Sequence, residues 1–157
     1  MFLTNTVQVA ILRARYPQRF ADDDATRLHR FLAAAGYQSH LLTVMDPETQ
    51  QLHPALVESA RPPTRQALAE ALDAAFAQMK AAHARGEEVE FLFAFAGHGQ
   101  AGQDLEGGIH LLDGTLGRDE LYLTVVQPAP ADYVHLLVDA CDSYFMVAAR
   151  GGPAAES

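Results

Sequence analysis

The chain contains one cysteine in 157 residues. A single thiol cannot close an internal disulfide, and it excludes the paired CxxC motifs of structural zinc sites. This scarcity favours a reducing compartment, or a thiol that is kept for its reactivity.

Basic residues are also scarce, because 11 Lys and Arg stand against 20 Asp and Glu and give a formal net charge of −9. Nucleic-acid binding needs clustered cations that neutralise phosphates, so the composition excludes a general nucleic-acid binder. An acidic surface favours solubility or the attraction of basic substrates.

Long hydrophobic runs are missing as well. No segment reaches the roughly 18 uncharged apolar residues of a membrane span, and no basic segment precedes an apolar run at the N-terminus. We therefore expect a cytoplasmic protein with no membrane partner. Apolar residues make up 49% of the chain, which is enough for one ordinary core. We predict one domain over residues 1–149 and a flexible tail or processing region over residues 150–157.

Apolar runs of β-forming residues, bounded by glycine, proline or polar residues, predict the strands. They span residues 7–14, 37–44, 89–96, 108–112 and 132–138. The run VEFLFAFA at 89–96 is almost unbroken, as in a strand that is covered on both faces of a parallel sheet. Residues 45–63 carry four prolines and are predicted to form a surface loop with a short hairpin or turn.

Helical periodicity follows the first and second strands. One helix should begin with an Asp of the run Asp22 to Asp24 as N-cap and end at Gly36. Its predicted apolar face consists of Leu28, Phe31, Leu32 and Ala35.

A second, longer helix is predicted from a cap at Thr64 through Arg85, with Gly86 as its stop signal. Its predicted apolar face consists of Ala67, Leu68, Ala71, Leu72, Ala75, Phe76 and Met79. A short helix is expected from Arg118 to Val126. Long helical crossovers require parallel strands, so the pattern predicts a three-layer α/β/α sandwich with a mainly parallel sheet.

Two of the predicted strands end in chemically reactive groups. His98 lies in a Gly-His-Gly segment after one strand, and Cys141 follows the last strand. Ligands of open parallel sheets bind at the carboxyl ends of the strands. An imidazole can take the proton of a thiol and later donate one to a leaving amine, as cysteine peptidases require. The N–H groups of Gly99 and Cys141 could form an oxyanion hole.

The segments FLFAFAGHG and HLLVDACDS, which contain these residues, resemble the two active-site strands of the caspase fold, especially its metacaspase and bacterial caspase-like branches. The 43 residues from His98 to Cys141 approach the spacing of about 50 known in caspases. The resemblance covers nearly the whole chain. It implies a cysteine endopeptidase with a Cys141–His98 dyad, on the large-subunit portion of that fold.

Substrate preference is also implied by the resemblance. Caspases that cut after Asp carry Gln two positions before the nucleophile, whereas metacaspases carry Asp, and this chain has Asp139. A second pocket Asp of metacaspases matches Asp24. Carboxylates are satisfied by a guanidinium and repel an acidic side chain, so Arg or Lys should precede the cut bond of the protein substrate. Asp24 has the alternative role of a helix cap.

Two positions depart from the family pattern, and one of them, Tyr144, supports a non-catalytic alternative together with the short chain. Tyr144 stands where the family usually has glycine, and Ala96 stands where metacaspases often have serine. The chain could therefore be a pseudoenzyme that acts as a binding or regulatory module. The caspase fold also continues past the nucleophile, so we expect a small-subunit-like chain or C-terminal segment as partner, with Arg150-Gly151 as a candidate processing bond.

We predict no metal and no cofactor. The acidic residues Asp104, Glu106 and Asp113 lack the spacing of an EF-hand, and we interpret them as a solvated loop, although the calcium that some metacaspases require is the open alternative. The glycines around His98 match neither the GxGxxG pattern nor the P-loop pattern of nucleotide-binding proteins. The remaining histidines are assigned no ligand role: His29, His40, His53, His83, His110 and His135.

Overall fold

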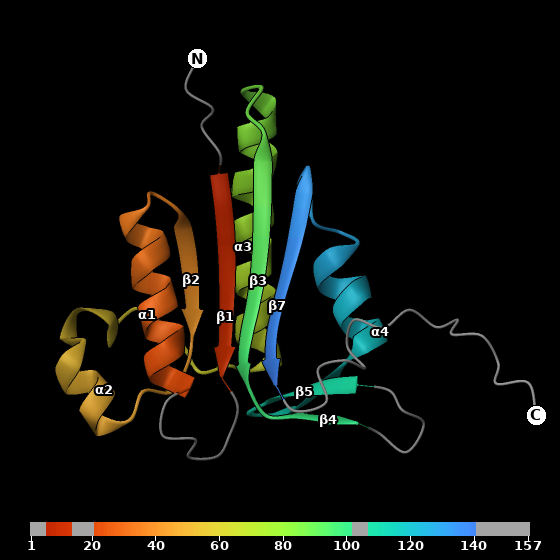
Figure 1. Ribbon diagram of the computed structural model, residues 1–157. Coiled ribbons are helices and arrows are strands. Elements are labelled where there is room, and N and C mark those ends of the chain that lie inside the picture. Colours follow the sequence, from red (N-terminus) through yellow and green to blue (C-terminus); the bar gives the residue numbers. More distant parts are fainter. Residues whose placement is uncertain (1–5, 14–20, 102–106, 141–157) are drawn as a thin grey trace, which may run out of the picture.

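A computed structural model of the chain describes residues 6–13, 21–101 and 107–140 (Figure 1). Its centre is a four-stranded sheet in which every pairing is parallel. In spatial order the strands are β2 (Gln38–Leu42), β1 (Thr6–Arg13), β3 (Val89–Gly97) and β7 (Tyr133–Ala140). The predicted α/β class with a parallel sheet is confirmed.

The alternation of side chains along β3 explains why the sheet is covered on both faces. Phe91, Phe93 and Phe95 are buried in one cluster with the helix α3 (Arg65–Ala84), which lies behind the sheet in Figure 1. Ala94 is buried in a second cluster with α1 (Ala21–Ala34). Successive residues of a strand point to opposite faces, so an unbroken apolar run supplies both clusters.

Helix α3 follows the prediction closely. The Thr64 side chain caps it by accepting a hydrogen bond of 3.1 Å from the Ala67 N–H. Its buried side chains are Ala67, Leu68, Ala71, Leu72, Ala75, Met79 and Ala82. Six of these seven lie on the predicted face, and the many alanines let the helix axis approach the sheet closely.

Helix α1 differs from the prediction at its beginning and on its apolar face. It begins at Ala21, so Asp22 to Asp24 lie inside its first turn and none of them is the N-cap. Phe31 is 69% exposed, whereas Ala25 and Leu32 are buried. The helix presents the row through Ala25, Leu28 and Leu32 to the sheet, and Phe31 lies outside this row. Its predicted end is confirmed, since Gly36 has a φ of 89°, which favours glycine.

The proline-rich region contains helices where the sequence suggested a loop with a hairpin or turn. Helix α2 (Pro47–Leu52) is capped by the Asp46 carboxylate, which accepts a 2.8 Å hydrogen bond from the Thr49 N–H. The short 3-10 helix η1 (Pro54–Leu56) follows. Proline at the first position of each helix loses no helical hydrogen bond, so these prolines start helices instead of excluding them.

A second, antiparallel sheet lies below the carboxyl ends of the main strands in Figure 1. It consists of β4 (Gly99–Ala101), β5 (Gly107–Leu111) and β6 (Gly114–Gly117). Only the strand corresponding to β5 was predicted. The predicted short helix is present as α4 (Arg118–Leu121), which continues as the π-helix η2 (Tyr122–Val126). In the part of the chain that the structure describes, no helix has the length and apolarity needed to cross a membrane.

The amino ends of β3 and β7 are joined by Asp132. Its carboxylate accepts a 2.8 Å hydrogen bond from the Val89 N–H and lies 2.9 Å from His83 Nε2, while its own N–H donates to the Val89 carbonyl at 2.9 Å. The bond from Val89, followed by the contact with His83, lowers the pKa of Asp132. The ionised carboxylate therefore stabilises the folded chain at neutral pH.

We expect Asp132→Asn to lower the thermal midpoint at neutral pH. Because the pKa of Asp132 is lowered in the folded state, its carboxylate stabilises the fold at pH values above its ordinary pKa of 3.8. This stabilisation is lost as the pH falls through the lowered pKa. Thermal melts of parent and variant between about pH 7 and pH 2 should therefore converge towards the acid end. Glu58→Gln, at an exposed position, is the control. A difference that stays constant down to the lowest pH would contradict this role.

Candidate active site

The strands β3 and β7 run side by side over their full length. They pair in parallel from Glu90 with Tyr133 to Gly97 with Ala140. The next residue after β3 is His98, and the next residue after β7 is Cys141. The pairing thus brings the segments that carry the predicted dyad to the same edge of the sheet. Cys141 itself, like Tyr144, lies outside the described residues.

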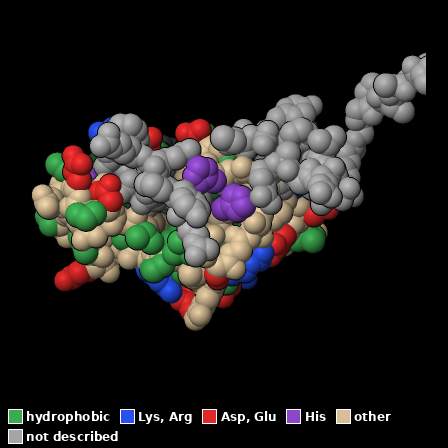
Figure 2. Space-filling view, turned by 90° about the horizontal axis from the view of Figure 1, so that it is seen from below, with side chains coloured by type: hydrophobic (Ala, Val, Ile, Leu, Met, Phe, Trp, Pro, Cys, Tyr) green, Lys and Arg blue, Asp and Glu red, His purple; other side chains and the backbone are tan. Residues whose placement is uncertain are grey.

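His98 stands between β3 and β4 and is half-buried. Its carbonyl oxygen accepts a 3.1 Å hydrogen bond from the N–H of His110 on β5. This bond fixes the backbone at the point where the chain leaves the main sheet and enters the second one. Figure 2 looks onto the carboxyl ends of the main strands, and histidine side chains are visible on this face.

The pairing of β4 determines the direction of the Gly99 amide. Gly99 is opposite Ile109, and the bond from His110 to His98 flanks this pair, so Gly99 and Ile109 form a non-hydrogen-bonded pair of the antiparallel ladder. In such a pair the N–H points away from the partner strand. Because β4 is the edge of its sheet, the Gly99 N–H is directed outwards.

His110 was assigned no ligand role from the sequence, yet the structure places it beside His98. Its ring Nδ1 lies 3.2 Å from Thr115 Oγ1 on β6. The two strands approach closely here, because a Cβ on Gly108 would lie 2.7 Å from the Thr115 Cγ2 methyl group. The Gly107-Gly108 pair at the start of β5 is the sequence signal for this approach, although it does not reveal the partner strand.

Arg65, at the start of α3, connects the second sheet to two helices. Its N–H donates to both carboxylate oxygens of Asp113, at 3.0 and 3.1 Å. Its guanidinium donates to the Thr115 carbonyl and forms a two-point ion pair with Glu120 of α4. The hydrogen bond with Glu120 is the main cause that raises the pKa of Arg65. The β5–β6 hairpin, and with it the strand that holds the His98 backbone, is thus fastened to α3 and α4.

Asp139 lies near the carboxyl end of β7, opposite Ala96 of β3. The neighbouring side chain of Val138 packs on the core cluster that includes α3, whereas Asp139 is exposed. Alternation along the strand therefore directs Asp139 to the face of the sheet that α1 covers.

Asp24 lies in the first turn of α1, at the same edge of the sheet (Figure 1). Its side chain is 60% exposed, and its carboxylate is 4.0 Å from Arg27 Nη1. The structure places Asp24 and Asp139 on the same side of the sheet. The described contacts pair Asp24 with Arg27 and do not join it to Asp139.

No metal centre is formed by the described residues, since no group of three or more His, Cys, Asp or Glu side chains among them could hold an ion. Asp113, one of the three acidic residues considered for calcium, is engaged with the Arg65 N–H. The other two, Asp104 and Glu106, lie outside the described residues.

The protein is an α/β sandwich with a parallel sheet. Its candidate site lies at the carboxyl ends of the central strands, where β3 leads to His98 and β7 leads to Cys141. The caspase domain family of peptidases matches residues 12–154. The chain therefore belongs to this family, which is one of cysteine peptidases, and the resemblance found in the two motifs is confirmed at that level. No curated protein and no solved structure gives a significant match.

Proposed function

We propose that the protein is a caspase-type cysteine endopeptidase of the metacaspase branch, which cleaves after Arg or Lys and uses Cys141 and His98 as a dyad. The observation that carries the proposal is the parallel register from Glu90 with Tyr133 to Gly97 with Ala140. It brings the carboxyl ends of the two strands side by side, which supports the proposal that a nucleophile and its proton-transfer partner follow them.

The proposed reaction proceeds in two stages. His98 takes the proton of the Cys141 thiol, the thiolate attacks the substrate carbonyl, and the N–H groups of Gly99 and Cys141 stabilise the oxyanion. The outward direction of the Gly99 N–H supports its part in this step. The C–N bond then breaks as His98 donates the proton to the leaving amine. Water, activated by His98, hydrolyses the thioester and regenerates the thiol.

The proposed preference for basic residues rests on Asp139. Its carboxylate is exposed beside the end of β3, and α1 brings Asp24 to the same side of the sheet. A guanidinium or ammonium group bound between them gains charge-assisted hydrogen bonds, whereas an acidic side chain is repelled.

We expect Cys141→Ala to abolish peptide hydrolysis and His98→Ala to lower kcat/KM by at least about a thousandfold, because the two groups act as one unit. The double variant should be no worse than Cys141→Ala. A fluorogenic peptide assay measures these rates on proteins purified after co-expression with the small-subunit-like segment. Thermal melts of the variants verify that they remain folded.

The control separates an enzyme from the pseudoenzyme alternative. Iodoacetamide labels any accessible thiol, whereas an Arg-based chloromethyl ketone needs a formed pocket and an activated thiolate. Rapid labelling of Cys141 by both reagents supports the peptidase. A folded protein that reacts with iodoacetamide alone and hydrolyses no peptide in the panel, even when the small-subunit-like segment is co-expressed, is the non-catalytic module.

Substrates with Arg or Lys before the cut bond should be turned over faster than matched Asp substrates. Asp139→Asn should lower kcat/KM for the Arg substrate by about tenfold and change turnover of uncharged substrates less, since it removes one charge from the pocket. Glu58→Gln, which removes an exposed carboxylate elsewhere, is the matched control. Faster turnover of the Asp substrate by the parent protein would overturn the proposed specificity.

A small-subunit-like segment is the proposed partner of β7. Within the described residues, β7 is the last strand of the sheet and pairs only with β3, so its outer edge can accept another strand. We expect residues 1–157 alone to be inactive or aggregated, and activity to appear when a small-subunit-like segment is supplied in the same cell. A monodisperse, fully active monomer of residues 1–157, assayed after size-exclusion chromatography, would contradict this assembly.

A further inference from the structure

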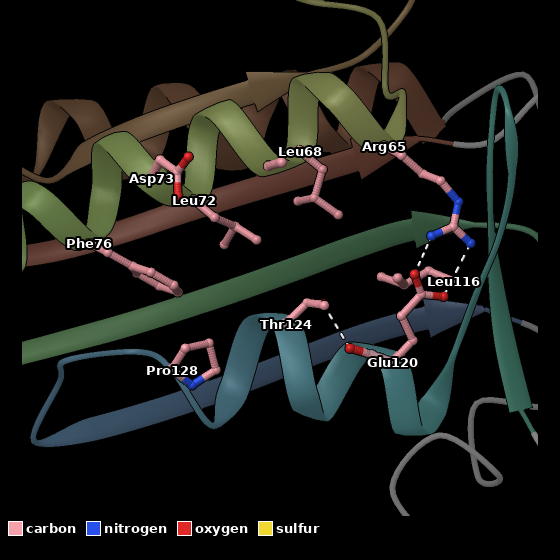
Figure 3. A pocket seen from close by; sticks show the side chains of 10 residues that line it. Arg65, Leu68, Leu72, Asp73, Phe76, Leu116, Glu120, Thr124 and Pro128 are labelled. Carbon is pink, nitrogen blue, oxygen red and sulfur yellow. Dashed lines mark hydrogen bonds and ion pairs between the residues drawn. The ribbon is translucent and has the colours of Figure 1, made fainter.

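A groove lies between α3 and the helix formed by α4 and η2, on the face of the sheet that these helices cover (Figure 3). Its volume is about 440 Å³, within the range of roughly 300–1,000 Å³ that is typical of ligand sites. The side chains that line it are mainly apolar: Leu68, Leu72, Phe76, Leu116 and Pro128. The groove lies on the face of the sheet that α3 and α4 cover, so it is separate from the edge of the sheet that carries His98.

Small side chains and a wide helical turn keep the groove open. Ala69 of α3 and Thr124 of η2 both line it and are exposed. The turn after Tyr122 closes with a hydrogen bond of 2.8 Å, which the N–H of Gln127 donates to the carbonyl oxygen of Tyr122, five residues earlier. This π-type turn sends Val125 into the core and leaves Thr124 on the groove, where its hydroxyl donates to the Glu120 carbonyl at 2.7 Å. Such turns recur at functional sites.

The charges around the groove are unequal. At one end Arg65 and Glu120 form an ion pair and neutralise each other. Asp73, on the exposed side of α3, also lines the groove, and no described residue forms an ion pair or hydrogen bond with its carboxylate. The unbalanced charge at the rim is therefore negative, on a chain whose formal net charge is −9.

We propose that this groove is the docking site for a basic amphipathic segment of another protein. Apolar side chains of the segment fill the space over Leu72 and Leu116, and a Lys or Arg pairs with Asp73. An amphipathic helix in an apolar groove is a recurrent mode of recognition, and the rim charge selects a cationic one. The exposed rim residues Ala69 and Thr124 make the groove accessible along its sides.

The test uses two labelled 15-residue peptides, one of Leu and Lys at helical spacing and one with Glu in place of every Lys. Fluorescence anisotropy measures their binding to the full chain. We expect the Lys peptide to bind and Ala69→Arg to weaken it at least about tenfold, because the new side chain fills the groove and repels cations. Ala81→Arg is the matched control, since Ala81 is exposed on the same helix but lies outside the groove and the change in net charge is identical.

A second variant tests the charge alone. Asp73→Asn should weaken the Lys peptide severalfold, the loss should shrink at high salt, and the Glu peptide should gain. Glu88→Gln, at an exposed position outside the groove, is the control. Equal effects of Ala69→Arg and Ala81→Arg would overturn the proposal. The proposal would also fail if neither peptide bound. If a small apolar dye then bound to the parent protein and Ala69→Arg weakened its binding, the groove would take small molecules instead.

Discussion

The parallel pairing of β3 with β7 is the constraint on which the rest of the molecule depends. The same eight pairs place Phe91, Phe93 and Phe95 against α3, leave Asp139 exposed on the opposite face, and bring the carboxyl ends of both strands to one edge. A shift by one residue would exchange the two faces of β7, so packing of the partly buried Leu136 and Val138 on the core favours the register that the candidate site needs. Core packing and site geometry are therefore determined by one set of contacts.

Arg65 has a comparable role for the second sheet. A surface ion pair contributes little to stability by itself. This arginine, however, also donates hydrogen bonds to the hairpin, from its backbone N–H to Asp113 and from its guanidinium to the Thr115 carbonyl. It holds the hairpin between two helices, and the same ion pair closes one end of the groove. The His98 backbone and the groove are thus connected through a continuous set of bonds, from β4 through His110 and Thr115 to Arg65.

Local pattern predicted the elements that bury a continuous apolar face. The strand runs and the Ala-rich face of α3 were predicted correctly, as was the position of His98 at the end of a strand. The strands β4 and β6 were not predicted, because three or four glycine-rich residues become a strand only when a partner such as β5 supplies the hydrogen bonds. Proline content predicts a loop over residues 45–63, yet Pro47 begins α2, which the Asp46 side chain caps. The position of Asp139 relative to Asp24, and the groove, arise from tertiary packing that no sequence spacing expresses.

The long separation between the paired strands affects how the chain is synthesised. Gly97 and Ala140 are neighbours in space but 43 residues apart in the chain, so β3 leaves the ribosome well before its partner. The pairing of β5 with β6 and the turn of α4 join residues that are close in the chain and can form during this interval, whereas closing the larger loop carries the greater entropic cost. Until β7 arrives, one edge of an apolar strand stays open, which makes the nascent chain vulnerable to aggregation and a natural client for chaperones.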